Sequence, residues 1–383
     1  MFISCLVPSF REVSEIQASE KVRHGVGYKL GTRKQENSGV IRRLAICAMV
    51  TLLATPLLFL SPSRADTERI TLRLHHFNSP KSIAQRLFIQ PWADEVEKKS
   101  GGRVKIQVFP AMQLGGKPSD LYDQVRDGVV DIIWTIPGYT PGRFPLTEVF
   151  ELPFLTGSAT AASQALTEFH QKWMRDEYKD THPLVFHSTA PTHIHTTEQQ
   201  IRVLEDLKGM KIRTPSRVNS ETLSALGAIP VGMPVPAVYE ALARGVVEGT
   251  AIPWTIMRPF RLHEVTDYHT EVDLSRVLFV MTMNKQRYNE LTPDAKNVID
   301  STTGMALAKR LGQMWHDDEN PGRAIAVELN HQILSLSEDE RERWQEKTQI
   351  VVNSWVDKVT ALGYDGRVLL EDAKHLLAKY GSD

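Results

Sequence analysis

The sequence predicts an α/β protein made of two lobes, each with a central sheet flanked by helices. Three observations support this. Strand and helix patterns alternate over the first part of the chain, the alternation returns with different residues after residue 183, and the pattern from residue 292 onward is almost wholly helical. With 383 residues the chain is also long enough for two domains of ordinary size.

The first lobe follows from a strand–helix–strand–helix–strand order, which is typical of a parallel sheet covered by helices. Gly101 and Gly102 end its first helix, which Ser79 and Pro80 precede as cap and first-turn residues. The predicted elements are a strand over 70–76, a helix over 81–99, a strand over 104–109, a helix over 118–127 and a buried strand over 129–136.

The pattern returns later in the chain with shorter strands, and Pro215 ends one of them. We expect strands over 184–187, 193–197, 211–214, 230–231 and 246–252, with helices over 219–226 and 236–243. Further on, Thr292 and Pro293 open a long helix that runs past Trp315, Ser337 caps another helix, and Gly366 precedes the last.

Charge is distributed unevenly along the chain. Residues 1–65 carry nine Lys or Arg against four Glu, so this leader has a net charge of +5 while the whole chain has −1. Hydrophobic residues make up 42% and charged residues 24%, as in an ordinary soluble protein. The balance leaves no basic surface of the kind that nucleic-acid binding requires, so no nucleic-acid partner is expected.

The leader has the pattern of a cleavable signal peptide. An apolar run over 44–60 follows Arg42 and Arg43, and Ser63 and Ala65 place small residues at the −3 and −1 positions of a cut after Ala65. The alternative is a membrane anchor, for which the run is short. Both cysteines lie in this leader, so the mature chain, which we expect in the periplasm, has no disulfide and no thiol nucleophile.

Motifs of catalysis are missing. The chain has no phosphate-binding glycine loop, no G-x-S-x-G elbow and no H-E-x-x-H pair. His193 and His195 lie on one face if their segment is a strand, yet no acidic residue stands at a convincing spacing to complete a metal site. We therefore expect no catalytic residues, no cofactor and no metal.

Arg213 is the first candidate for ligand binding. It stands at the carboxyl end of the strand over 211–214, opposite Ile212, and the carboxyl ends of strands face the ligand crevice in open α/β sheets. A guanidinium matches a carboxylate with two parallel hydrogen bonds and keeps its charge. The alternative is a surface arginine in a solvated ion pair. Trp254, Trp134 and Tyr139 follow other strands and are either core or cleft residues.

Five motifs in order carry a resemblance to a known family. They are FPAMQLGG at 109–116, ELPFL at 151–155, EDLKGMKIRTP at 205–215, VYEALARGVVEG at 238–249, and MNK at 283–285 before LTP at 291–293. With these motifs the chain resembles the extracytoplasmic solute-binding receptors of TRAP (tripartite ATP-independent periplasmic) transporters, of the DctP type. The resemblance covers nearly the whole mature chain.

The resemblance implies the two-lobed fold of periplasmic binding proteins, with a long helix spanning both lobes and hinge closure on an organic anion without catalysis. By motif position, the first lobe takes residues 66–190 and 279–318, and the second takes 191–278 and 319–383. Arg213 matches the family's carboxylate-binding arginine. The implied partners are a small organic carboxylate and the membrane subunits of a TRAP transporter.

Two departures from the family bear on the ligand. Ile252 stands where receptors for dicarboxylates or sialic acid often have Asn, and His193 stands where sialic-acid receptors have a second arginine. Since a second buried carboxylate would lack partners, we expect a monocarboxylate with an apolar or aromatic body, such as a 2-oxo or 2-hydroxy acid. The expected ligand-binding residues are Arg213, His193, Trp254, Ile252, Trp134, Tyr139, His76 and Phe77.

Other functions stay open at this stage. A receptor for a dicarboxylate or a sugar acid would use the same fold. A ligand sensor that docks on a signalling protein would do so too, and a periplasmic enzyme would have only the histidines to work with.

Overall fold

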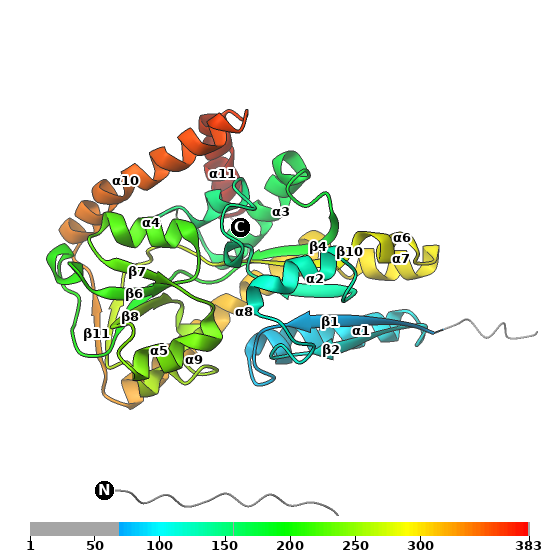
Figure 1. Cartoon of the computed structure of the whole chain (residues 1–383), viewed down its shortest axis with the longest axis horizontal. Helices are drawn as coiled ribbons and strands as arrows, with labels where there is room; N and C mark the ends of the chain where they lie inside the picture. The colour runs from blue at the N-terminus through cyan, green and yellow to red at the C-terminus, as the bar shows by residue number, and fades with distance from the viewer. Residues whose placement is uncertain (1–68, 156, 382–383) are drawn as a thin grey trace, which may run out of the picture. The chain divides into compact units, whose positions relative to one another are not determined.

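The computed structural model describes residues 69–155 and 157–381 (Figure 1). These residues belong to one compact unit. The predicted leader and its cleavage site lie outside the described residues. No helix in the described part of the chain combines the length and the apolar character that crossing a membrane requires.

The first sheet has the strand order β2-β1-β3-β10-β4. Its strands are β1 (Ile70–His76), β2 (Val104–Phe109), β3 (Ile132–Thr135), β4 (Thr181–Ser188) and β10 (Leu278–Asn284). β1 pairs in parallel with β2 and β3, as the sequence predicted, whereas β10 runs antiparallel to both β3 and β4. The sheet is therefore mixed, because a strand from late in the chain returns to it.

The second sheet has the order β11-β9-β5-β8-β6-β7. Its strands are β5 (His193–Thr196), β6 (Lys211–Thr214), β7 (Ile229–Gly232), β8 (Gly249–Ile252), β9 (Tyr268–Glu271) and β11 (Gln332–Ser335). Because successive side chains of a strand point to opposite faces, Ile194, Ala251 and Ile212 share one face, and Arg213 and Thr250 share the other. Ile194, Ala251 and Ile212 pack into one core cluster.

Helices cover both sheets. They are α1 (Gln90–Lys99), α2 (Leu121–Arg126), α3 (Ala159–Phe169), α4 (Arg217–Ala225), α5 (Val238–Ala243), α6 (Lys285–Asn289), α7 (Pro293–Ser301), α8 (Gly304–Asp317), α9 (Glu319–Glu328), α10 (Glu338–Ala361) and α11 (Gly366–Gly381). Figure 1 shows α4 and α5 on opposite sides of β6, β7 and β8. The mixed α/β class with two sheets flanked by helices is confirmed.

The helix predicted from Thr292 past Trp315 is wrong as a single element. It is divided into α7, α8 and α9, and the first break falls at Thr302 and Thr303. Gly304, the first residue of α8, takes a φ of 71°, which an L side chain rarely adopts, so the chain turns at this residue. The region from residue 292 is almost wholly helical, as predicted, with the short strand β11 between α9 and α10.

A helix that spans both halves is present, and it is α10. Ser337 caps it, since its hydroxyl accepts a hydrogen bond from the backbone N–H of Glu340 at 3.3 Å. Near its start, Trp344 packs among residues of the second sheet. Further along, Trp355 packs with α3 residues, and its indole donates to the carbonyl of Pro145 at 2.8 Å. α11 then packs against α3.

Two chain segments cross between the sheets side by side. One leads from β4 to β5 and the other from β9 to β10. The backbone N–H of Thr189 donates to the carbonyl of Val277, and that of Thr192 to the carbonyl of Ser275, both at 2.9 Å. These crossings fall close to residues 190 and 278, where the sequence placed the lobe boundaries, and the exact boundaries stay a prediction.

Candidate ligand-binding site

Arg213 lies at the end of β6 and is 1% exposed. Its Nε donates to the carbonyl of Met233 at 2.9 Å, and its guanidinium lies within hydrogen-bonding reach of the hydroxyl of Tyr139. Among the described residues no carboxylate pairs with it, and its Nη2 has no hydrogen-bond partner. Burial lowers the pKa of Arg213 because the charged form loses its hydration. A buried cation with an unused donor requires an anion.

Tyr139 approaches Arg213 from the other sheet. It ends a short helical turn, Pro137–Tyr139, directly after β3. Its hydroxyl accepts a hydrogen bond from the backbone N–H of Val235 at 3.0 Å, and burial raises its pKa. The described residues offer no acceptor for the hydroxyl's own proton. Two donors, one on Arg213 and one on Tyr139, are therefore free side by side.

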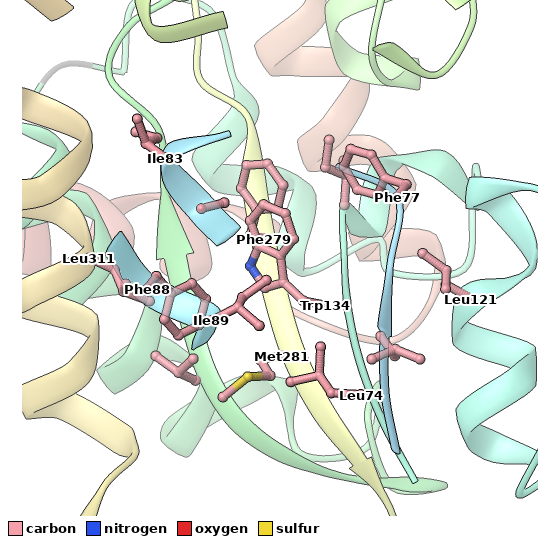
Figure 2. Close-up of a cluster of buried hydrophobic side chains, with 14 of the residues drawn as sticks. Leu74, Phe77, Ile83, Phe88, Ile89, Leu121, Trp134, Phe279, Met281 and Leu311 are labelled. Atoms are coloured by element: carbon pink, nitrogen blue, oxygen red, sulfur yellow. The ribbon is translucent and has the colours of Figure 1, made fainter. Parts of the chain in front are cut away.

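Aromatic rings lie behind Tyr139. Phe77, which follows β1, is 5.3 Å from the ring of Tyr139 and is stacked on Trp134 at 5.7 Å, with an angle of 11° between the planes. Trp134 in turn stacks on Phe279 at 4.2 Å (Figure 2). Trp134 is fully buried and its indole nitrogen lies 2.9 Å from Nε2 of His187, so it backs Phe77 from within the first sheet.

His76 is occupied within its own half of the molecule. Its Nε2 lies 2.7 Å from Oε1 of Gln85, which fixes the proton on Nε2, and its Nδ1 accepts from the backbone N–H of Asn78 at 3.2 Å. Burial lowers its pKa to about 4, so it is neutral at physiological pH. Neither ring nitrogen is directed to Arg213.

His193 and Trp254 line a different cavity from the one beside Tyr139. Theirs, of about 590 Å³, lies where the crossing segments meet α9 and also includes Glu271, Asp273 and Glu319. Nδ1 of His193 accepts from the backbone N–H of Val272 at 3.3 Å, and the indole of Trp254 donates to Glu271 at 3.1 Å. Burial lowers the pKa of His193.

Ile252 lies between these two groups. It pairs with His193 across β5 and β8, and it follows Thr250, which pairs with Arg213, on the same face of the sheet. Its side chain is buried in the same core cluster as Phe77, Trp134 and Tyr139. The predicted residues thus form two groups, one around Arg213 and one around His193, with His76 in neither.

The sequence reading did not single out Met233, whose carbonyl holds Arg213 and which lines a cavity of about 560 Å³ beside Tyr139 and Ser216. Met233 follows β7, the parallel neighbour of β6, so the same carboxyl-end rule would have found it. Arg276, buried in a crossing segment and bonded to the carbonyl of Thr189 at 3.0 Å, had no such signal.

The described residues contain no group of three or more His, Cys, Asp or Glu placed to hold a metal ion. The arrangement around Arg213 has the parts of an anion-binding site: a buried guanidinium, a hydroxyl donor and aromatic surface.

Comparisons with known proteins point in the same direction. The family model of the bacterial extracellular solute-binding proteins, family 7 (DctP), matches residues 74–358. A TRAP solute-binding protein from Rhodoferax ferrireducens, crystallised with copurified benzoate, is 42% identical with a TM-score of 0.80, over 82% of this chain and 99% of that one.

Two further structures are similar. A TRAP solute-binding protein of an unidentified microbe from a marine metagenome, specific for aromatic acid ligands and bound to 3-hydroxybenzoate, is 44% identical with a TM-score of 0.80, over 82% of this chain and 99% of that one. A TRAP periplasmic protein from Bordetella bronchiseptica with bound (R)- and (S)-mandelate is 26% identical with a TM-score of 0.76, over 81% and 99%.

Proposed function

Because the chain belongs to the DctP-type bacterial extracellular solute-binding proteins, family 7, we propose that it is the periplasmic receptor of a TRAP transporter and that it binds an aromatic monocarboxylate. The family consists of binding receptors and is not a class of enzymes. The observation that carries the proposal is the pair of buried donors, Nη2 of Arg213 and the hydroxyl of Tyr139, which have no acceptor among the described residues.

A carboxylate satisfies both donors at once. One of its oxygens accepts from Nη2 of Arg213 and the other from the hydroxyl of Tyr139, and hydrogen bonds to a charged group are stronger than neutral ones. The anion also neutralises a guanidinium that pairs with no carboxylate among the described residues. The site therefore selects for a negatively charged group with two oxygen acceptors, such as a carboxylate.

The rest of the ligand meets apolar surface. Phe77 lies beside Tyr139 and is backed by the stack of Trp134 and Phe279, and Ile252 adds an aliphatic surface on the Arg213 face of the second sheet. Aromatic rings favour such offset or tilted contacts. Relatives that are 42% and 44% identical to this chain were crystallised with benzoate and 3-hydroxybenzoate, which supports an aromatic acid.

Binding favours the closed arrangement of the two lobes. Tyr139 belongs to the first sheet's half, whereas Arg213 and Val235 belong to the second, so a carboxylate held by both residues stabilises the state in which they meet. The membrane subunits of the transporter would then receive the ligand from this closed form.

The experiment is calorimetric titration of the protein purified from the periplasm. Benzoate, 3-hydroxybenzoate and mandelate are compared with succinate and galactonate. We expect binding of the aromatic acids, and Arg213→Ala should weaken it by at least about tenfold, since a hydrogen bond to a charged group contributes about 1.5–3 kcal/mol. Arg213→Lys should also bind poorly, because it keeps the charge but loses the planar fork.

The matched control is Arg244→Ala, which removes an arginine whose side chain is 76% exposed and pairs only with Glu240 on the same helix. It should leave affinity unchanged. If the protein binds only succinate, the proposed receptor role stands and the proposed aromatic ligand is wrong. If Arg213→Ala binds benzoate with wild-type affinity, the proposed binding site is wrong.

Export is tested on the same preparation. If the leader is a signal peptide cut after Ala65, N-terminal sequencing of the periplasmic protein reads Asp66-Thr67 first. Retention of residues 44–60 in a membrane-bound form would instead favour the anchor.

A further inference from the structure

Three histidines form a hydrogen-bonded series across the second sheet. They are His195 on β5, His269 on the neighbouring β9, and His331, which directly precedes β11 on the far side of β9. Nδ1 of His195 lies 2.8 Å from Nδ1 of His269, and Nε2 of His269 lies 3.1 Å from Nδ1 of His331. His195 and His269 are fully buried.

The Ile252 carbonyl, at the His195 end of this series, determines the tautomer of each of the three histidines. Nε2 of His195 lies 3.2 Å from the carbonyl oxygen of Ile252, and a carbonyl can only accept, so His195 carries its proton on Nε2. Its Nδ1 must then accept from Nδ1–H of His269. Nε2 of His269 is left to accept from Nδ1–H of His331. Each neutral ring thus donates once toward Ile252.

The series ends at the wall of the proposed ligand site. Ile252 is the last residue of β8 and lies on the Arg213 face, and Trp254 follows two residues later. The ring of Trp254 is 4.8 Å from those of both His195 and His269. The histidines therefore contact both the backbone carbonyl of Ile252 and the side chain of Trp254.

We propose that His195 is a positioning residue for ligand binding: held in one tautomer by His269 and His331, it fixes the Ile252–Trp254 segment, whose Ile252 side chain provides apolar surface on the Arg213 face. The inference rests on the proposed function for its ligand. It does not require His195 to touch the ligand.

An added proton can enter only at the outer end without breaking the series. Nε2 of His331 is free to take it and lies 3.6 Å from Asp267, with His263 nearby. A second proton on Nε2 of His269 would face the Nδ1–H of His331, so two donors would meet and the link would break. His269 faces Glu271, Arg323 and His193, and His195 faces His193 and His269.

Burial keeps the series neutral over the physiological range. It lowers the pKa of His269 to about 3 and lowers that of His195 well below its ordinary value. The positioning effect should therefore persist from neutral pH down to mild acid. Below that, the link between His331 and His269 is the first to fail.

The tautomers are tested directly by long-range ¹H–¹⁵N correlation spectra of the whole protein with ¹⁵N-labelled histidine. We expect His195 protonated on Nε2 and both His269 and His331 on Nδ1, with no change between pH 8 and pH 6 at His195 and His269. An Nε2–H tautomer at His269, or titration of His195 near its ordinary pKa, would overturn the proposed series. This measurement needs no ligand.

The positioning role is tested with two variants. His195→Gln keeps a donor that reaches the Ile252 carbonyl, whereas His195→Leu removes it at similar size. We expect the benzoate dissociation constant to stay within about threefold of wild type in the first and to rise about tenfold in the second. His331→Leu, at the less buried end, should give a smaller rise in the same direction and serves if His195→Leu does not fold.

The outcomes separate the two proposals. If the wild type binds none of the aromatic acids, the proposed function fails while the tautomer result still stands or falls by itself. If benzoate binds, Arg213→Ala abolishes binding and the histidine variants bind like wild type, the positioning role is wrong and the proposed function remains.

Discussion

Tyr139 and Arg213 are both buried, yet each keeps one hydrogen-bond donor without an acceptor among the described residues. These donors are the hydroxyl of Tyr139 and Nη2 of Arg213. Tyr139→Phe removes one of these donors and keeps the ring that contacts Phe77. We expect benzoate affinity to fall by about tenfold, since one hydrogen bond to a charged group contributes about 1.5–3 kcal/mol. Calorimetric titration measures it.

Tyr239→Phe provides the control for that change. Its hydroxyl donates to Glu264 at 3.2 Å in an exposed contact. This variant should bind like wild type. Unchanged affinity in Tyr139→Phe would mean that the ligand carboxylate is held by Arg213 alone.

Single residues also show which signals act locally. Strand alternation and the carboxyl-end rule place Arg213 at the end of a strand, and the structure has it buried at the end of β6; its contact with a ligand stays a prediction. The hydrogen bond of His76 could not be predicted from its own strand, since its partner Gln85 comes from the following helical segment. His193 and Trp254 were placed with Arg213, but which cavity a side chain lines depends on tertiary packing.

At the scale of elements, α8 packs on α3 with no room for a side chain at Gly312. A Cβ built there would lie 2.4 Å from Cα of Thr160. Alanine favours a helix interior by about 1 kcal/mol over glycine, while overpacking costs about 1–3 kcal/mol. The net effect on the free energy of unfolding should therefore be destabilising. We expect Gly312→Ala to lower the melting temperature by several degrees, as measured by differential scanning calorimetry.

The comparison variant is Gly381→Ala in α11, where a Cβ would meet nothing within 4 Å. It should leave the melting temperature unchanged or slightly higher. A stabilised Gly312→Ala variant would show that α3 and α8 move apart at little cost.

Elements whose hydrophobic residues recur with a clear period could be predicted, whereas elements that depend on contacts with residues distant in sequence could not. β1 alternates buried and exposed residues at its start, which the sequence shows. β10 is buried along its whole length between β3 and β4, so it has no alternation to detect. The break before α8 depends on a positive φ at Gly304, and a glycine inside a helical pattern does not by itself reveal one.

At the scale of the whole molecule, the two halves meet at a second place besides Tyr139. Arg217, at the start of α4, pairs with Glu148 of the first half, and its Nε lies 3.1 Å from the carboxylate. Gly138 lies so close to Ser216 that a Cβ on it would come within 2.5 Å of the serine Cβ. Glu151 is buried at this contact, with its Oε1 3.5 Å from the same Cβ position on Gly138.

This contact makes stability depend on pH. Burial raises the pKa of Glu151 to about 8 from 4.5, and neighbouring Glu148 adds to the rise. Between those values the folded protein holds a proton that the unfolded chain has released. The free energy of unfolding contributed by this group therefore falls as the pH rises from 4.5 to 8.

Glu151→Gln should remove that dependence, because the amide is neutral at every pH and similar in shape to the protonated acid. We expect the variant to melt close to wild type at pH 5 and several degrees above it at pH 8, with Glu371→Gln, whose exposed side chain pairs only with Lys374, unchanged at both. If closure of the two halves is what buries Glu151, benzoate affinity of the wild type should also decline toward pH 8 and that of the variant should not. Equal differences in melting temperature at both pH values would show that Glu151 is ionised in the folded protein.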